Sequence, residues 1–526
     1  MTRDFFRSTG VVGALTLVSR ISGLIRDMVF SRAFGAGLLM DAFLVAFKIP
    51  NFLRRLFAEG AFSQAFVPVV SEYKVRREHD EVRELIDGVA GTLGAALVVL
   101  TAVGVIAAPL LILVFAPGFR SEPDKFELTV TMLRWTFPYL FFISLTALAG
   151  GVLNSYGRFS VPALTPVLLN LVLIAFALWI APHAASPGVA LAAGVFAAGI
   201  VQLAVQVPFL LRLRLLRRPR WHRAHEGVRR IGRLMLPAIF GSSVQQVGLL
   251  LDTLVASFLT TGSIAWLYYA DRLMEFPLGV FSIALATVIL PGLARHHASG
   301  SVEAFAATID WALRLVFLIV LPASVAMFVL AGPLIATIFH YGEFNDHDAR
   351  MATLALMAYS FGLLGFSLVK VLAPGYFARQ DTRTPVKVGL RSLALNMGLN
   401  LLVVLPLGLA GTVPGIHAGL ALSSGIAAFV NGGLLYLGLR RTGAVVHGPG
   451  WAPLTLRLGA AVAVMAAVLW WLAGDLGQWL AFDAGERILR LSVCIGAGAT
   501  AYFVVLLAAG ARPRDFAGRA AGQAGP

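Results

Sequence analysis

The chain has 526 residues, of which 58% are hydrophobic and only 13% are charged, and its mean hydropathy is +0.82. A soluble domain is about one quarter charged and could not bury this much apolar surface, so the composition excludes a soluble protein and indicates a polytopic membrane protein. A net charge of +15 would suggest nucleic acid for a soluble chain, but in a membrane protein the distribution of Lys and Arg between loops has to be tested first.

The N-terminal stretch MTRDFFRSTGVVGALTLVSR looks like a signal peptide, yet it lacks a small-residue cleavage site and its apolar run continues to Phe34. We therefore predict a retained first helix. An apolar helix of about 20 residues crosses a membrane, and the sequence offers about fourteen such candidates. In chain order they lie at 9–34, 41–70, 87–116, 128–153, 162–182, 187–211, 231–260, 264–294, 308–339, 350–376, 386–409, 414–438, 452–474 and 486–510.

Basic residues alternate from one loop to the next. The connections 71–86, 212–233, 379–387 and 440–441 carry most of them, and 212–233 alone holds nine arginines. The loops at 35–40, 183–186, 261–263 and 410–413 carry no Lys or Arg. Because basic loops stay on the cytoplasmic side, both termini are predicted to be cytoplasmic, and the positive charge is explained without nucleic acid.

The chain also matches itself at an offset of 223 to 224 residues. The segment Pro109–Phe115 with Gly118 aligns with Pro333–Phe339 and Gly342, and the turns NSYGRFSVP and FARQDTRTP align with each other. Each half then holds six spans, so the repeats are parallel, an arrangement that puts a substrate site between two lobes. The predicted regions are an N-terminal lobe at 1–225, a C-terminal lobe at 226–445, and two additional helices with a cytoplasmic tail at 446–526.

Charged residues inside three spans are the main functional signal. Charges at membrane depth are costly and usually face a cavity or a partner. The first span carries Arg20, Arg26, Asp27 and Arg32, the second carries Asp41, Lys48, Arg54, Arg55 and Glu59, and the eighth carries Asp271, Arg272 and Glu275. Asp41, Lys48, Arg55 and Glu59 fall on one helical stripe, and Tyr268, Arg272 and Glu275 share another face.

Cations outnumber acids in this set, and guanidinium groups match phosphate or carboxylate. We therefore predict a central cationic cavity for an anionic substrate. Arg20, Arg26, Lys48, Arg54, Arg55 and Arg272 would bind it, while Asp41, Glu59, Asp271 and Glu275 would form ion pairs or gate it. Arg26 and Arg32 could instead lie near a helix end, and Asp27 and Asp271 could be structural partners of neighbouring arginines.

Weaker candidates remain open. Asp252, in the middle of a span, could bind a coupling Na⁺ or proton, or hydrogen-bond a neighbouring helix. Lys370 and Arg391 could face the cavity or be paired. His340 and His347 invite a metal interpretation, but their spacing fits a solvated outer loop better. The sequence contains no Walker loop and no hydrolase constellation, so we expect neither an enzyme nor a cofactor or metal.

Four motifs resemble the MurJ/MviN family of lipid II flippases, in the superfamily that also holds MATE exporters. They are SRISGLIRD, GAGLLMDAFLVAFKIPNFLRRLFAEGAFSQAFVP, WLYYADRLMEFPLGVFSIAL and VKVLAPGYFARQDTRTPVK. The resemblance implies two six-helix lobes in a V, plus two C-terminal helices that form a groove for a lipid tail. It implies transfer of undecaprenyl-diphosphate-linked peptidoglycan precursor across the bacterial inner membrane, from the cytoplasmic to the periplasmic leaflet.

By motif, the family's cavity arginines fall on Arg20, Arg26, Arg54 and Arg272, and Asp41, Arg55 and Glu59 match its other charged positions. Some relatives have a Na⁺ site, for which only Asp252 is a counterpart here. The implied partners are lipid II, membrane lipids, and a coupling cation or the membrane potential. The alternatives are an ion-coupled exporter of small molecules or other lipid-linked oligosaccharides, and a membrane scaffold that transports nothing.

Overall fold

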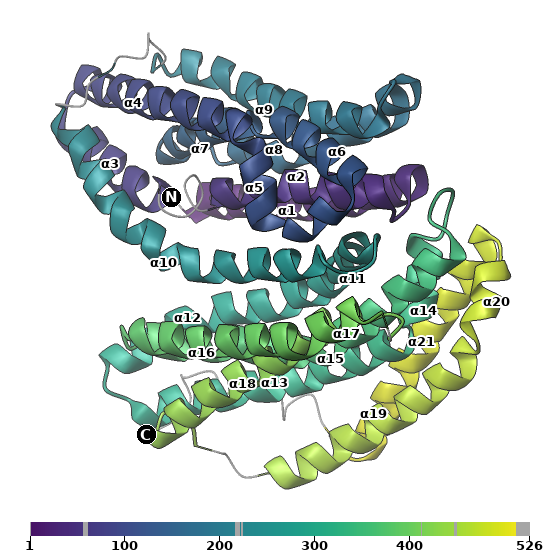
Figure 1. Cartoon of the computed structure of the whole chain (residues 1–526). Helices are drawn as coiled ribbons and strands as arrows, with labels where there is room; N and C mark the ends of the chain where they lie inside the picture. Colours follow the sequence, from purple (N-terminus) through teal and green to yellow (C-terminus); the bar gives the residue numbers. More distant parts are fainter. Residues whose placement is uncertain are drawn as a thin grey trace. The chain divides into compact units, whose positions relative to one another are not determined.

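The computed structural model describes residues 2–55, 62–215, 221, 225–411, 413–446 and 450–511, with side chains from residue 10 onward except at 63–64, 236–247, 249 and 283. Every regular element in these ranges is a helix (Figure 1). The predicted all-helical class is therefore confirmed. The chain divides into two compact units, unit 1 (Met1–Ala265) and unit 2 (Trp266–Pro526), and α11 (Ser263–Pro277) runs through the boundary.

Unit 1 is built from pairs of packed helices. α1 packs on α8, α2 on α6, and α7 on α9, while α10 runs beside α3 (Figure 1). The bounds are α1 (Thr2–Phe34), α2 (Leu38–Arg54), α3 (Ser63–Arg76), α4 (His79–Ile106), α5 (Ala108–Phe115), α6 (Pro123–Thr136), α7 (Tyr139–Ser155), α8 (Ser160–Ala175), α9 (Pro187–Arg212) and α10 (Glu226–Ala256).

Unit 2 is centred on α15, which packs against α13 and α18. Its helices after α11 are α12 (Ile283–Ala298), α13 (Val302–Val329), α14 (Ala331–Ile338), α15 (Asp346–Phe377), α16 (Arg383–Leu399), α17 (Leu405–Leu409), α18 (Ala418–Arg441), α19 (Trp451–Ala473), α20 (Leu476–Ala481) and α21 (Ala484–Ala508). The predicted boundaries at 225/226 and 445/446 follow the sequence repeat rather than these contacts, and they stay predictions.

The helix pattern repeats along the chain, as the sequence predicted. α4 and α13 have 28 residues each, α5 and α14 have eight each, and each pair is 223 residues apart. A π-helical turn follows α8 at Phe176–Ile180, and another follows α16 at Asn400–Val404. Because even these irregular turns recur, the two halves share one backbone plan.

Eleven stretches of the described residues are long and apolar enough to cross a membrane. They establish a multi-pass membrane protein, but the predicted number of fourteen is not confirmed. The predicted spans 9–34, 41–70 and 231–260 are not among the eleven, and they coincide with α1, with α2 and α3, and with α10. The predicted span 9–34 carries four charged residues. Parts of the spans 41–70 and 231–260 lie outside the residues or side chains that the structure describes.

Proline and polar caps set several helix starts. α5, α6 and α9 have proline in their first two positions, where its missing N–H costs no helical hydrogen bond. Asn345 caps α15, because its side chain accepts from the Asp348 N–H while the Asp348 carboxylate accepts from the Asn345 N–H. These local signals end helices inside apolar runs. The predicted spans 87–116 and 308–339 are accordingly broken, after Ile106 and Val329.

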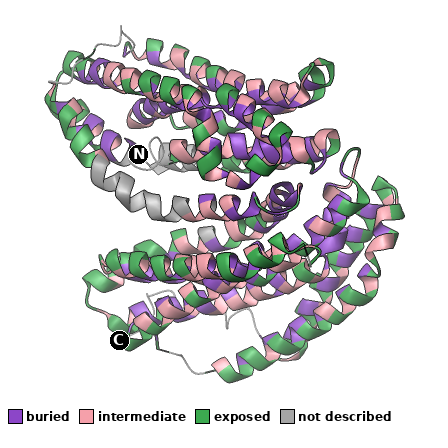
Figure 2. Ribbon diagram, in the orientation of Figure 1, coloured by how far each residue is buried: buried purple, intermediate pink, exposed green. Residues whose placement is uncertain are grey.

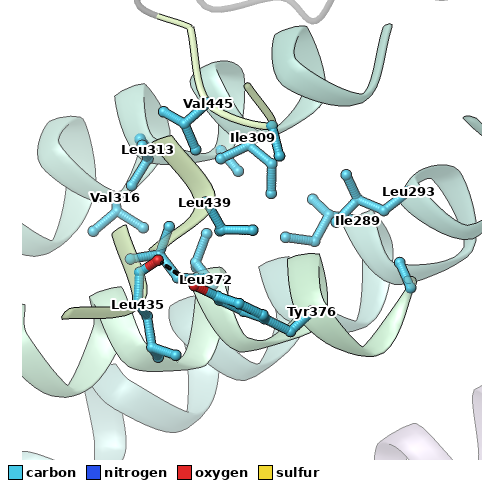
Figure 3. Close-up of a cluster of buried hydrophobic side chains, with 14 of the residues drawn as sticks. Ile289, Leu293, Ile309, Leu313, Val316, Leu372, Tyr376, Leu435, Leu439 and Val445 are labelled. Atoms are coloured by element: carbon cyan, nitrogen blue, oxygen red, sulfur yellow. Dashed lines mark hydrogen bonds between the residues drawn. The ribbon is translucent and has the colours of Figure 1, made fainter. Parts of the chain in front are cut away.

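The core of unit 2 gathers aliphatic side chains from α12, α13, α15 and α18 (Figure 3). Ile289, Leu293, Ile309 and Leu439 are at most 2% exposed. The Tyr376 hydroxyl enters this cluster and donates to the Leu435 carbonyl oxygen at 2.8 Å, the dashed line in Figure 3. A buried hydroxyl is thereby satisfied within an apolar layer.

The C-terminal helices α19 and α21 pack against each other and, through α19, against α13. The buried Arg487 of α21 donates to the carbonyl oxygens of Ala336, His340 and Leu480, which fixes α21 to the end of α14 and to α20. The other face of α19 is exposed in Figure 2, and Trp470 and Trp471 are 76% and 77% exposed. Exposed tryptophans near a helix end are typical of a membrane interface.

Candidate functional site

The predicted cavity residues fall into both units, so each unit is described by itself. In unit 1, α2 contributes Asp41, Lys48 and Arg54, Arg55 follows directly after α2, and α1 contributes Arg20 and Arg26. In unit 2, α11 contributes Asp271, Arg272 and Glu275. Glu59 lies outside the described residues.

Arg26 lies between α1 and α8 and is only 6% exposed. Its Nη2 and Nε donate to Asp27 Oδ1 at 2.7 and 3.0 Å, and its Nη1 donates to Asn170 Oδ1 at 3.1 Å. The Asn170 amide in turn donates to the Ser22 hydroxyl and the Ser19 carbonyl oxygen. The Arg26 side chain is therefore part of the wall of unit 1, held by the neighbouring acid that the sequence suggested and by an asparagine that it did not.

Arg20, by contrast, is exposed on α1, about four turns before the helix ends at Phe34. Arg54 is half-buried, and its Nε donates to Asn51 Oδ1 at 2.8 Å, one turn earlier on α2. Arg55 is exposed. The cations of α1 and α2 thus differ in access. Arg26 is enclosed, whereas Arg20, Arg54 and Arg55 keep surface that a ligand could reach.

Lys48 joins α2 to α10. Its Nζ donates to the Thr253 hydroxyl at 2.5 Å, and both residues lie in unit 1. Asp252, the candidate for a coupling cation, is the half-buried neighbour of Thr253. Lys48 and Thr253 thereby connect the side chains of α2 and α10 next to Asp252 in the chain.

Asp41 forms an ion pair with a residue that the sequence analysis did not single out. It is 1% exposed and lies 3.2 Å from Nζ of Lys125, a residue of α6, rather than beside an arginine. Its two carboxylate oxygens accept the backbone N–H groups of Gly262 and Ala265 at 2.8 and 3.0 Å. The partner was missed because Lys125 lies 84 positions along the chain, where helical spacing carries no information.

In unit 2, the predicted face of α11 is confirmed. Arg272 Nη1 lies 3.1 Å from Glu275 Oε2, and its Nη2 donates to the Tyr268 hydroxyl at 3.1 Å. The guanidinium also lies over the Tyr268 ring, 5.4 Å from its centre. Arg272 and Asp271 are half-buried and Glu275 is exposed, so this pair stays accessible to an anion.

Another ionic cluster in unit 2 was not predicted at all. Asp310 of α13 accepts from Arg314 Nε at 2.8 Å and from Trp451 Nε1 at 2.6 Å, and Arg314 lies over the Trp451 ring. Two opposite charges four residues apart inside a span were a visible signal. This cluster joins the start of α19 to α13.

The weaker candidates have ordinary surroundings. His340 pairs with Asp346 at 2.8 Å, and the His347 ring packs on Trp266. In the described part of the chain, no group of three or more His, Cys, Asp or Glu could hold a metal ion. Lys370 is half-buried and Arg391 is exposed.

An all-helical, multi-pass chain with a repeated helix plan is the architecture of a membrane transporter, and solved structures agree. The chain matches a structure described as "Lipid II flippase MurJ, inward closed conformation" with a TM-score of 0.77 at 23% identity, covering 94% of this chain and 97% of that one. It also matches an inward-facing MATE-family multidrug resistance transporter with a TM-score of 0.63 at 17% identity, covering 82% and 98%. These likenesses establish the fold.

The sequence comparisons give the family. The family model described as lipid II flippase MurJ matches residues 30–487. A probable lipid II flippase MurJ from Vibrio cholerae is 44% identical over 98% of both chains, and a lipid II flippase MurJ from Burkholderia cenocepacia is 42% identical over 98% of this chain and 100% of its own. The chain belongs to the MurJ family of lipid II flippases.

Proposed function

We propose that this protein moves lipid II, the undecaprenyl-diphosphate-linked peptidoglycan precursor, from the cytoplasmic to the periplasmic leaflet of a bacterial inner membrane. The observation that carries the proposal is family membership over 98% of the chain. The cationic side chains of α1, α2 and α11 support it independently, because a diphosphate headgroup needs guanidinium or ammonium partners at membrane depth.

In this proposal Arg20, Arg54, Arg55, Lys48 and Arg272 contact the headgroup. Arg26 is proposed as a further substrate-binding residue, which would have to release Asp27 and Asn170 before it could reach the headgroup. The accessible Arg272 already lies 3.1 Å from Glu275, so an anion that binds Arg272 competes with that carboxylate. Exchange of an internal acid for the substrate phosphate gives a physical route by which binding could change the conformation. Asp41, Glu59 and Asp271 remain the other proposed ion-pairing acids, and Asp252 remains the proposed residue for a coupling cation.

The regional assignment follows the repeat. We propose an N-terminal lobe at 1–225, a C-terminal lobe at 226–445, and a C-terminal pair of helices at 446–526 that gives the isoprenoid tail an apolar path. Both termini are proposed to be cytoplasmic, from the distribution of Lys and Arg between loops. Transport would then follow alternating access, driven by a coupling cation or by the membrane potential. An ion-coupled exporter of small molecules is not favoured, because the relatives that match nearly the whole chain are flippases.

The proposal is tested by growth of cells depleted of their own lipid II flippase. Arg20→Ala, Arg54→Ala and Arg272→Ala are each expected to abolish growth at normal protein levels, because each removes a phosphate partner. Arg77→Ala is the matched control, because Arg77 is exposed and its ion pair with Glu81 lies at the surface. Normal growth with all three cavity variants would contradict the proposal.

A further inference from the structure

The C-terminal pair of helices, α19 and α21, is joined to the rest of unit 2 by polar contacts as well as by apolar packing. The Trp451 indole of α19 donates to Asp310 of α13, and the Tyr502 hydroxyl of α21 donates to the Leu318 carbonyl oxygen at 2.7 Å. In a bilayer, apolar helix faces gain little by exchanging lipid for another helix, so polar groups and close packing decide how helices associate. The polar contacts between α13 and α19 are therefore expected to set the position of the pair.

Trp451 is the first residue of α19, and its indole contacts three side chains of α13. Asp310 Oδ1 accepts from the indole N–H at 2.6 Å, while Asp310 Oδ2 accepts from Arg314 Nε at 2.8 Å. The Arg314 guanidinium lies over the indole, 5.4 Å from its centre, and the Phe317 ring meets the indole edge-on with the ring centres 5.8 Å apart. The hydrogen bond fixes the direction of the indole and the cation fixes its face, so its orientation is defined.

The acid of this cluster has an equivalent in the first half of the chain, but the arginine has none. Asp310 is the ninth residue of α13, and the ninth residue of α4, 223 positions earlier, is Asp87. The position equivalent to Arg314 is Gly91. At this position, a guanidinium thus occurs only in the half against which the C-terminal pair packs. Because buried charges inside a membrane span are costly and apolar residues could fill the same space, we expect such a pair where an orientation has to be specified.

The orientation of the indole affects the whole of α19, because Trp451 lies at one end of the helix. The other end leads into α20, where Arg487 of α21 joins the Leu480 carbonyl oxygen to the carbonyl oxygens of Ala336 and His340. The 23 residues of α19 span about 35 Å. With the α20 end held, a rotation by about 10° would move the start of α19 by about 6 Å, more than half the usual distance of about 8–10 Å between packed helix axes.

We infer that Asp310 and Arg314 are positioning residues of the C-terminal pair: they hold the Trp451 indole and thereby set the angle at which α19 lies on α13. In the proposed function this pair gives the isoprenoid tail its apolar path, so the same two residues determine how well a long tail is accommodated. The part of the inference that concerns the tail rests on the proposed function, whereas the part that concerns the position of α19 does not.

The test uses variants of the full-length protein. Asp310→Leu/Arg314→Met removes the buried ion pair as a unit, which is often neutral for stability, and with it the carboxylate that accepts from the indole. Trp451→Phe removes the indole N–H and keeps an aromatic ring. Trp470→Phe is the matched control, because Trp470 lies on the same helix and is 76% exposed.

The first readout needs no lipid II. Hydrogen–deuterium exchange of peptides covering residues 454–462 is expected to be about tenfold faster in the double variant and in Trp451→Phe, and within about twofold of wild type in Trp470→Phe. Exchange in α4 and α7 and the temperature of thermal unfolding should change little, which separates a loss of position from a general loss of stability. Unchanged exchange at 454–462 in the double variant and in Trp451→Phe would overturn the inference. Should the double variant not accumulate, Trp451→Phe alone decides.

The second readout is the binding, by microscale thermophoresis, of lipid II and of an analogue with the same headgroup and a farnesyl tail. The double variant and Trp451→Phe are expected to bind lipid II about tenfold more weakly, and the short-tailed analogue within about twofold of wild type, because only the long tail reaches the pair. Equal weakening for both lipids, or no weakening for lipid II, would overturn the role in tail accommodation. If the wild-type chain binds neither lipid, the proposed function fails while the exchange result still stands.

Discussion

The two halves of this protein share a backbone plan but not a set of buried charges. α4 with α5 and α13 with α14 have matching lengths, and π-helical turns follow α8 and α16. Yet the residues 223 positions after Arg26, Asp41 and Lys125 are Leu249, Ile264 and Asp348. The second half instead has Asp310 and Arg314 beside Trp451. Helix length thus follows the apolar pattern, which the two halves share, whereas most of the buried charged residues differ between the halves.

The largest loss of stability should come from removing one partner of the buried Arg26–Asp27 ion pair of the first half. Arg26→Met removes the cation beside Asp27, which is 0% exposed, and is expected to lower the free energy of unfolding by about 3–5 kcal/mol. Arg76→Met is the control, because Arg76 and Glu72 form an exposed pair worth at most about 1 kcal/mol. Thermal unfolding in detergent measures both, and equal effects would contradict the assignment of Arg26 to the wall of unit 1.

Much of the fold could be predicted from the sequence, because membrane-spanning helices and their repeat are recorded in apolar length and proline position. The breaks after Ile106 and Val329 were missed, since proline in the first turn of the next helix leaves the apolar run intact. The shared face of Tyr268, Arg272 and Glu275 could be predicted because it depends on local spacing.

The site was less predictable. Lys125 and Asn170 reach Asp41 and Arg26 across 84 and 144 positions, and no local pattern relates residues so far apart in the chain. The sequence therefore singled out the charged residues of α1, α2 and α11 as candidates, but it did not predict most of their partners. Asp310 and Arg314, four positions apart, were visible in the sequence and were overlooked.

A smaller loss of stability is expected from substituting Gly118, whose equivalent in the second half is Gly342. A Cβ atom on Gly118 would lie 2.2 Å from the Ser257 carbonyl oxygen, so Gly118→Ala is expected to cost about 2–3 kcal/mol by forcing two backbone segments apart. Gly118→Ala should also speed exchange at residues 257–262. A neutral effect, measured by thermal unfolding, would show that this close approach is not needed.

Lowering the pH should destabilise unit 2 through protonation of His417. This ring is buried against Trp266, its Nε2 lies 2.9 Å from the Met351 carbonyl oxygen, and desolvation lowers its pKa from 6.5 to about 4, with His347 adding to the shift. The unfolded chain therefore binds the proton first as the pH falls. Stability is complete above about pH 6.5 and is lost toward pH 4, by about 2 kcal/mol at pH 5. His417→Gln should flatten this dependence in thermal unfolding, and an unchanged slope would contradict it.

The smallest effect is expected at Gly342, the repeat partner of Gly118. Here the reason for glycine is its backbone angle, a φ of +59°. Gly342→Ala should cost about 1 kcal/mol, and Gly342→Asn less, because asparagine tolerates this conformation better. A larger loss of stability in Gly342→Ala than in Gly118→Ala, measured by thermal unfolding, would contradict this difference between the two glycines.

The most direct test of the central claim is the distribution of lipid II between leaflets in cells depleted of their own flippase and supplied with this protein. With the wild-type chain, lipid II should become accessible to a reagent added outside the inner membrane. With Arg54→Ala or Arg272→Ala at equal protein levels it should stay inaccessible. The account would be contradicted if the amount of accessible lipid II were the same with and without the wild-type chain. It would also be contradicted if neither arginine variant lowered that amount.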